Sequence, residues 1–216
     1  GTITSSAARR LAPLLAAALV AAGWAAPRAA LAQPAPGEIG GELAAVGGTV
    51  AGSDFRNVGV GFGGEAGLRY GLTTRLSLGL AGHGSWHDAE GLDGSLRLLG
   101  AFLEPRYLLG RPGSGLRPFV GLRLGAARWG ARQSADTLTA DVSAYGLQAG
   151  GTAGVSHALG DAASLEVAAV ASFLSFGDAE VDAALGGREL PSFMRGGSGT
   201  RGSLLGVRTL LRLRVP

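Results

Sequence analysis

The chain has 216 residues, enough for one sizeable domain, and contains 39 Gly, no Cys and no Lys, so all 19 basic residues are Arg. The lack of Cys excludes a disulfide framework, a thiolate metal site and a lipid-modified N-terminal Cys. The sequence pI is about 10.1, but the net charge of +3 comes from Arg9, Arg10 and Arg28, and beyond residue 32 the remaining 16 Arg balance 16 acidic residues. This balance argues against binding of nucleic acid.

The first 32 residues have the composition of a secretory signal peptide. Arg9 and Arg10 form a positive segment, an apolar run follows from Leu11 to Ala26, and Ala30-Leu31-Ala32 gives an A-x-A cleavage site. The 16-residue apolar run is shorter than the roughly 20 residues of a spanning helix, although an N-terminal membrane anchor is the alternative. We therefore expect a signal peptide over 1–32, a linker over 33–36 and one domain over 37–216.

From Val58 onward, apolar residues occupy every second position. Val58, Val60 and Phe62 alternate with glycines, and Ala66, Leu68, Tyr70 and Leu72 continue the series. This period of two predicts a β-strand with one apolar face. The segment is longer than the usual five or six residues of a strand in a soluble domain.

The same alternation recurs along the rest of the chain. A first strand around Leu43–Val50 is ambiguous, because Glu42 shares parity with Val46 and Val50. With it we count eight strands, the others being Val58–Leu72, Leu76–His87, Leu99–Leu109, Val120–Gly125, Tyr145–Val155, Leu165–Phe173 and Leu205–Val215.

Connections of two lengths alternate between these strands. The short ones are 71–75, 110–115 and 159–163, and the long ones are 85–95, 130–142 and 177–202, with 52–57 as a shorter member of the second set. Short turns at one end and long loops at the other are typical of an up-and-down outer-membrane barrel. The fold class expected is all-β, an eight-stranded antiparallel transmembrane barrel with a packed polar interior.

The charged side chains decide which face of the strands points outward. An Arg at mid-membrane on the lipid face costs roughly 2–4 kcal/mol, so several such residues would exceed the ~5–15 kcal/mol stability of a typical domain. We therefore expect an interior charge network: Glu65, Arg69, Glu104, Arg106, Arg123, Glu166, Arg208 and Arg212. A soluble periplasmic barrel is the alternative, and it requires an apolar interior.

Aromatic residues near the strand ends predict two girdles at the membrane boundaries. Tyr70, Tyr107 and Phe119 lie near the short turns, and Trp86, Trp129 and Tyr145 lie near the long loops.

The segments GEAGLRYGLTTRLSLGL, LEPRYLLG and RPFVGLRLGAARW, together with the final alternating strand, resemble the small outer-membrane barrels of the outer membrane protein A and X type. The resemblance is one of pattern over residues 37–216. It implies an integral protein of a Gram-negative outer membrane, inserted by the outer-membrane assembly machinery and surrounded by outer-membrane lipids and lipopolysaccharide. Barrels of this type usually end on an aromatic residue, whereas this sequence ends Arg214-Val215-Pro216.

The segment from His83 to Glu90 is the best candidate for chemistry. His83, Ser85 and Glu90 resemble the base, nucleophile and acid of outer-membrane lipid A deacylases. Parity places His83 and Ser85 inside, away from a lipid substrate, so this hydrolase is the alternative function. His83 and His87 are about 13 Å apart on one strand, too far to share a metal ion.

Gly59-x-Gly61-x-x-Gly64 matches a dinucleotide-binding spacing but lies within a strand pattern with no helix after it. We expect no cofactor and no metal. The function expected is a structural or surface-contact role without catalysis, with an extracellular partner at the 177–202 loop through Leu190, Phe193 and Met194. A channel is disfavoured, since eight strands leave little lumen.

Overall fold

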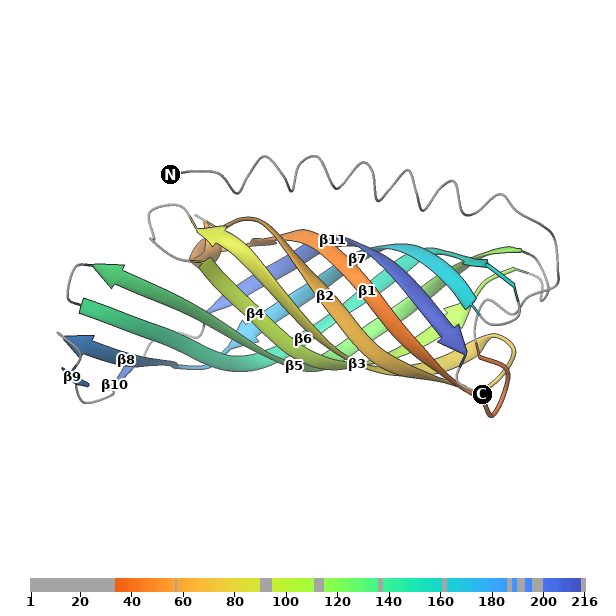
Figure 1. The fold of residues 1–216 in the computed structure, drawn as a ribbon, viewed down its shortest axis with the longest axis horizontal. Helices are drawn as coiled ribbons and strands as arrows, with labels where there is room; N and C mark the ends of the chain where they lie inside the picture. Colours follow the sequence, from red (N-terminus) through yellow and green to blue (C-terminus); the bar gives the residue numbers. More distant parts are fainter. Residues whose placement is uncertain are drawn as a thin grey trace.

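Eight long antiparallel strands close into a barrel in the computed structural model (Figure 1). The structure describes residues 34–56, 58–89, 95–110, 115–135, 138–160, 163–185, 188–189, 193–195 and 200–214. The barrel strands are β1 (Ile39–Ala51), β2 (Val58–Gly71), β3 (Leu76–Ala89), β4 (Ser95–Leu108), β5 (Leu116–Ala135), β6 (Leu138–Ala158), β7 (Ala163–Phe176) and β11 (Arg201–Arg214).

The barrel closes because β11 pairs with both β7 and β1. Leu211 lies opposite Leu43 of β1 and opposite Leu165 of β7, and β1 to β6 each pair with the next strand along the chain. The eight predicted strands and the up-and-down barrel are thus confirmed. The ambiguous first segment is β1, and Glu42, Val46 and Val50 all lie on its inward face, where Val50 joins an apolar cluster.

Two of the predicted long loops are largely strand. β5 and β6 pair as far as Ala135 and Leu138, which leaves only two residues of the expected 130–142 loop between them. The expected 177–202 loop contains β8 (Ala179–Leu185), β9 (Arg188–Glu189) and β10 (Phe193–Arg195). β8 pairs with the start of β6, and together these strands extend past the rest of the barrel at the left of Figure 1.

The outer face of the barrel is a continuous apolar band. On β4 and just beyond it, Leu99, Leu103, Tyr107 and Leu109 are exposed, and the side chains between them on the same face are those of Ala101 and Pro105. Ten residue steps cover about 33 Å along a strand. At a tilt of roughly 35–45° the band is therefore about 25 Å tall, the height of the apolar band of membrane barrels.

Among the residues that the structure describes, no helix has the length and apolar character to cross a membrane. The short 3-10 helix η1 (Ser53–Phe55) joins β1 to β2 and places Phe55 in the barrel mouth.

Candidate functional site: the charged interior

The inward face of β4 passes through all the layers of the barrel interior. Starting from the long-loop end, its buried side chains are Leu96, Leu98, Phe102, Glu104, Arg106 and Leu108. The two leucines belong to an apolar cluster at the mouth, and Leu108 belongs to a smaller one with Phe119 and Ala168 at the other end. A charged middle is therefore enclosed by two apolar layers.

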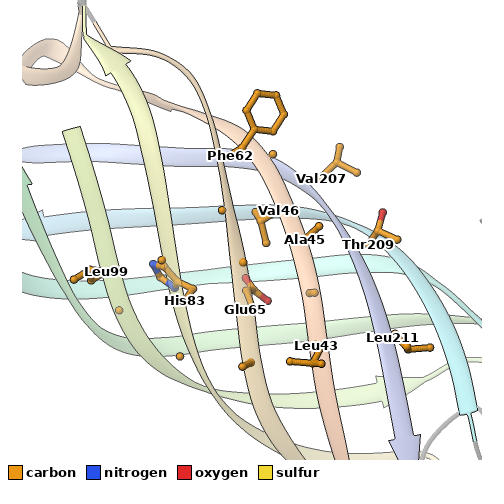
Figure 2. Close-up of a pocket in the computed structure, with 18 of the residues that line it drawn as sticks. Leu43, Ala45, Val46, Phe62, Glu65, His83, Leu99, Val207, Thr209 and Leu211 are labelled. Atoms are coloured by element: carbon orange, nitrogen blue, oxygen red, sulfur yellow. The ribbon is translucent and has the colours of Figure 1, made fainter. Parts of the chain in front are cut away.

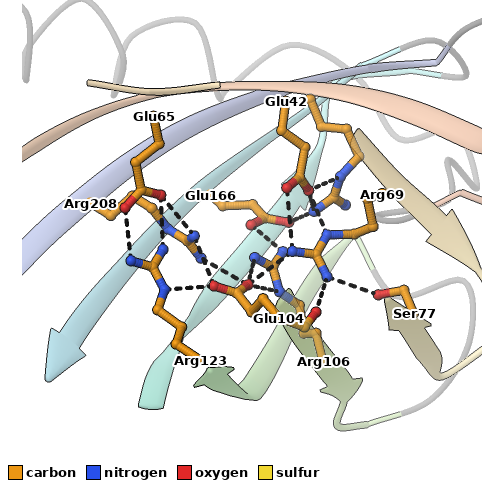
Figure 3. A network of polar contacts seen from close by, with 10 residues as sticks. Glu42, Glu65, Arg69, Ser77, Glu104, Arg106, Arg123, Glu166 and Arg208 are labelled. Carbon is orange, nitrogen blue, oxygen red and sulfur yellow. Dashed lines mark hydrogen bonds and ion pairs between the residues drawn. The ribbon is translucent and has the colours of Figure 1, made fainter. Parts of the chain in front are cut away.

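Glu104 is the centre of the charged layer (Figure 3). Its carboxylate accepts hydrogen bonds from Arg69 at 2.9 Å, from Arg123 at 2.8 Å and from Arg208 at 3.1 Å, and it pairs with Arg106 on its own strand. Its side chain is 1% exposed. A buried carboxylate without partners would carry a large desolvation penalty, and four guanidinium groups offset that penalty here.

Three further glutamates complete the network around Glu104. The carboxylate of Glu65 accepts two hydrogen bonds of 2.8 Å from the terminal nitrogens of Arg123, which makes the pair bidentate. Glu65 also forms an ion pair with Arg208. Glu42 contacts Arg69 at 2.6 Å and Arg212 at 2.7 Å.

Glu166 bridges Arg106 and Arg212. The network thus joins six of the eight barrel strands, because its members come from β1, β2, β4, β5, β7 and β11.

The network holds five arginines and four glutamates, so its formal charge is +1. All eight residues selected from the sequence lie in it. Glu42 is the one network member that was not predicted from the sequence, although it shares the alternation of Val46 on the inward face of β1. Arg117 is a sixth buried arginine, outside the network, and it approaches the backbone oxygen of Thr74.

Inward glycines provide the space that the long arginine side chains occupy. A Cβ atom at Gly79 would lie 2.6 Å from Nη2 of Arg69, and one at Gly121 would lie 2.7 Å from Oγ1 of Thr152 and 3.5 Å from Cγ of Glu104. Two phenylalanines fill the remaining space. The guanidinium of Arg123 stacks 4.1 Å above the ring of Phe102, and that of Arg106 stacks 4.3 Å above Phe119.

The long-loop end of the interior is closed by apolar side chains. Phe55 of η1 packs edge-on against Trp129 and Phe176, with ring centroids 6.5 Å and 6.4 Å apart. Leu98, Leu174 and the other members of this cluster are buried around it. The members of this cluster come from η1, β1, β4, β5, β6, β7 and β11.

Four of the six residues selected as girdle aromatics point outward. Tyr70 and Tyr107 are exposed near the short turns, and Trp86 and Tyr145 are exposed near the long loops. The other two selections, Phe119 and Trp129, are wrong. Both share the parity of Arg123 on β5, so Phe119 lies inside below Arg106 and Trp129 packs against the mouth cluster.

The candidate hydrolase residues lie on the inward face of β3. The hydroxyl of Ser85 is 3.0 Å from Nε2 of His87 rather than bonded to His83. Among the described residues, neither ring nitrogen of His83 has a hydrogen-bond partner. Glu90 lies outside the described residues. A cavity of about 20 Å³ borders these side chains, which is room for about one water molecule.

In the part of the chain that the structure describes, no group of three or more His, Cys, Asp or Glu side chains could hold a metal ion. Gly59, Gly61 and Gly64 lie within β2, which leads through a turn into β3, so no helix N-terminus meets them.

Comparison with solved structures finds small barrels. Neisserial surface protein A is 16% identical, with 82% of this chain and 97% of that chain covered and a TM-score of 0.56. The attachment invasion locus protein Ail of Yersinia pestis is 10% identical over 83% of this chain and 98% of that chain, with a TM-score of 0.47. The outer membrane protein OprG of Pseudomonas aeruginosa is 14% identical over 83% and 98%, with a TM-score of 0.45.

The likeness to neisserial surface protein A is one of fold, and it agrees with the resemblance drawn from the sequence. No family model matches the sequence, and no curated protein matches it.

Proposed function

We propose that this chain is an integral outer-membrane barrel with a sealed interior, which serves as a rigid base for surface contacts made at its long-loop end. The observation that carries the proposal is the inverted arrangement of polarity. Among the described residues, twenty-eight large apolar side chains are exposed, while six arginines and four glutamates are buried within the barrel. In water this arrangement would expose a large apolar surface. In a lipid bilayer the apolar outer face contacts hydrocarbon, and the charged inner face is enclosed within the barrel.

A soluble periplasmic carrier is disfavoured by the same observation. Such a barrel needs an apolar interior to hold a ligand, and here the middle of the interior is filled by Arg–Glu pairs. The proposal includes export directed by the N-terminal segment and insertion by the outer-membrane assembly machinery. The inserted barrel is then surrounded by outer-membrane lipids and lipopolysaccharide.

A solute channel is disfavoured because the interior is packed at three levels. The Phe55 cluster, the ion network and the layer of Leu108 and Phe119 follow each other along the barrel. In planar bilayers we expect no conductance steps of defined size. The role proposed is structural, with no catalysis.

The lipid hydrolase is the second candidate, and the 3.0 Å contact between Ser85 and His87 is what favours it. Ser85 and His87 both face inward, however, and both are buried, so an acyl ester outside the barrel would not reach them. Replacing Ser85 by Ala should leave the lipid A profile of the host unchanged. If the variant instead abolished a deacylated lipid A species that the wild-type chain produces, the hydrolase would be established.

The surface contact is proposed at the end where β5, β6, β8 and β10 extend past the other strands. Asp141, Glu180 and Asp182 are exposed there, and the free edge of such a sheet can pair with another chain. Of the three residues selected as contacts, Leu190 lies outside the described residues, and only the backbone of Phe193 and Met194 in β10 is described.

Fractionation of cells that express the chain tests the proposal. We expect the protein in the outer-membrane fraction, with a mobility on denaturing gels that differs between boiled and unboiled samples. Protease added to intact cells should cleave within 177–202 and spare the barrel strands. Recovery in the osmotic-shock fluid without detergent would contradict the proposal.

A further inference from the structure

Two exposed arginines lie directly beyond the apolar band, on neighbouring strands at the long-loop end. Arg97 of β4 faces outward opposite Gly130 of β5, and Arg128 of β5 faces outward opposite Leu99. The two are therefore diagonal neighbours, with backbones about 7–8 Å apart. Long arginine side chains at this spacing can bind one phosphate group together.

Aromatic side chains flank both arginines. Trp86 of β3 is the register partner of Arg97, and Tyr145 of β6 is the register partner of Arg128. The guanidinium of Arg128 lies 5.2 Å from the centre of the Tyr145 ring and donates a hydrogen bond of 3.2 Å to Ser143. Trp and Tyr favour the boundary between the apolar band and the headgroups, so the two arginines lie at headgroup level.

The described acidic residues near this pair lie further from the band. Asp88 is opposite Ser95, one outward position beyond the Trp86–Arg97 pair, and Asp141 pairs with Arg132 at 3.6 Å. Among the described residues, neither Arg97 nor Arg128 forms an ion pair with a carboxylate. No described carboxylate therefore neutralises either guanidinium group.

A broad apolar hollow in the outer wall begins next to the arginines. It has a volume of about 1170 Å³, is lined across β7, β11, β1, β2, β3 and β4, and reaches Leu99, the register partner of Arg128 (Figure 2). Glu65 and His83, on the inward faces of β2 and β3, also border it. Phe62 and Val207 border it at one end and Leu43 and Leu211 at the other. Its outward floor is made by Ala45, Gly64, Ala66, Gly82 and Gly84.

We propose that a phosphorylated, multiply acylated lipid of the lipid A type binds here, with a phosphate between Arg97 and Arg128 and an acyl chain in the hollow. This inference rests on the proposed function, because it needs the long-loop end to lie in the outer leaflet. Charge complementarity selects the phosphate, and the adjacent apolar hollow selects an acylated ligand over free phosphate. The Trp86 and Tyr145 rings border the headgroup.

The test uses the full barrel in neutral detergent and measures the lipid A that each variant retains by native mass spectrometry. Replacing both Arg97 and Arg128 by Gln should lower binding by about tenfold or more, since charge-assisted hydrogen bonds are lost. Arg201→Gln is the matched control, because Arg201 is an exposed arginine of β11 that does not line the hollow, whose first β11 residue is Val207. It should leave binding unchanged.

The hollow is tested separately by filling it. A Cβ atom at Gly64 would come no closer than 3.4 Å to Ala44 O, and one at Gly82 no closer than 3.7 Å to Gly100 O, so the wall accepts a side chain at both positions. The variant Gly64→Leu with Gly82→Leu should fold and lose lipid A binding while both arginines remain.

Each outcome has one meaning. Unchanged binding in the double Arg variant would overturn the site, and equal binding of phosphatidylglycerol and lipid A by the wild-type barrel would overturn the choice of lipid A. A barrel that shifts on heating but retains no lipid A contradicts this inference alone. A chain that shows no heat-dependent shift in any detergent contradicts the proposed function.

Discussion

Glu104 and Arg106 lie two residues apart on β4 and form an ion pair inside the barrel, while Pro105 between them faces outward. The period of two of the strand brings both charges to the same face. Each also binds partners on other strands, Glu104 reaching Arg69, Arg123 and Arg208, and Arg106 reaching Glu166. This pair explains how a strand with adjacent charges can cross an apolar layer.

Replacing Glu104 by Gln removes the carboxylate shared by four arginines and raises the formal charge of the network from +1 to +2. Breaking a buried ion pair from one side costs about 3–5 kcal/mol. We expect a loss of this size in the free energy of unfolding. It is measured by urea titration of the barrel in lipid vesicles, with the folded fraction read from the band of unboiled samples on a denaturing gel. Glu180→Gln, at an exposed position on β8, is the control and should change stability by less than about 0.5 kcal/mol.

Glu65 and Arg123 should show strong coupling, because their two 2.8 Å hydrogen bonds form a bidentate pair. Either Glu65→Gln or Arg123→Gln alone leaves a buried charge with fewer partners. The double variant removes one charge of each sign, so it should be less destabilised than the sum of the single variants, by about 1 kcal/mol or more. Strict additivity of the three unfolding free energies would show that the pair contributes no specific interaction.

The cost of a charge on the outer face should depend on its depth. Leu103 lies near the middle of the apolar band and Leu109 lies at its short-turn edge. Leu103→Arg should cost about 2–4 kcal/mol of folding free energy in bilayers, and Leu109→Arg about 0–1 kcal/mol. Equal costs at the two positions would mean that the band is not immersed in hydrocarbon.

Gly79 and Gly82 of β3 provide a matched pair on opposite faces. A side chain at Gly79 would meet the guanidinium of Arg69, whereas one at Gly82 points out of the barrel, where its Cβ comes no closer than 3.7 Å to Gly100 O. Gly79→Leu should therefore destabilise the barrel by about 1–3 kcal/mol through overpacking, and Gly82→Leu should leave its unfolding midpoint nearly unchanged. The same urea titration measures both.

The strands and the direction of their faces were predictable because alternation is a local signal. Val58 to Leu72 shows it without interruption, and β2 covers that segment. The extent of β5 and β6 was harder to predict, because Gly130 and the polar residues Arg132, Gln133 and Ser134 resemble a loop. Leu138, Ala140 and Val142 alternate with Thr139 and Asp141 at the start of β6, but this signal covers only five residues.

The site was only partly predictable. Parity identified the inward charges, but the partners of Glu42 are 27 and 170 residues away and follow from barrel closure. Phe119 and Trp129 lie near strand ends, as girdle aromatics do, but their side chains point inward. Parity alone would have placed both with Arg123 inside.

The most direct test of the account is where single residues lie relative to lipid. Because the sequence has no Cys, a spin label can be placed on one introduced cysteine at Leu103, at Val207 or at Asp182. In bilayers, labels at Leu103 and Val207 should be relaxed by dissolved oxygen and protected from a water-soluble nickel complex, with the reverse at Asp182. Relaxation of the Leu103 and Val207 labels by the nickel complex would contradict the account, because the apolar face would then be in water.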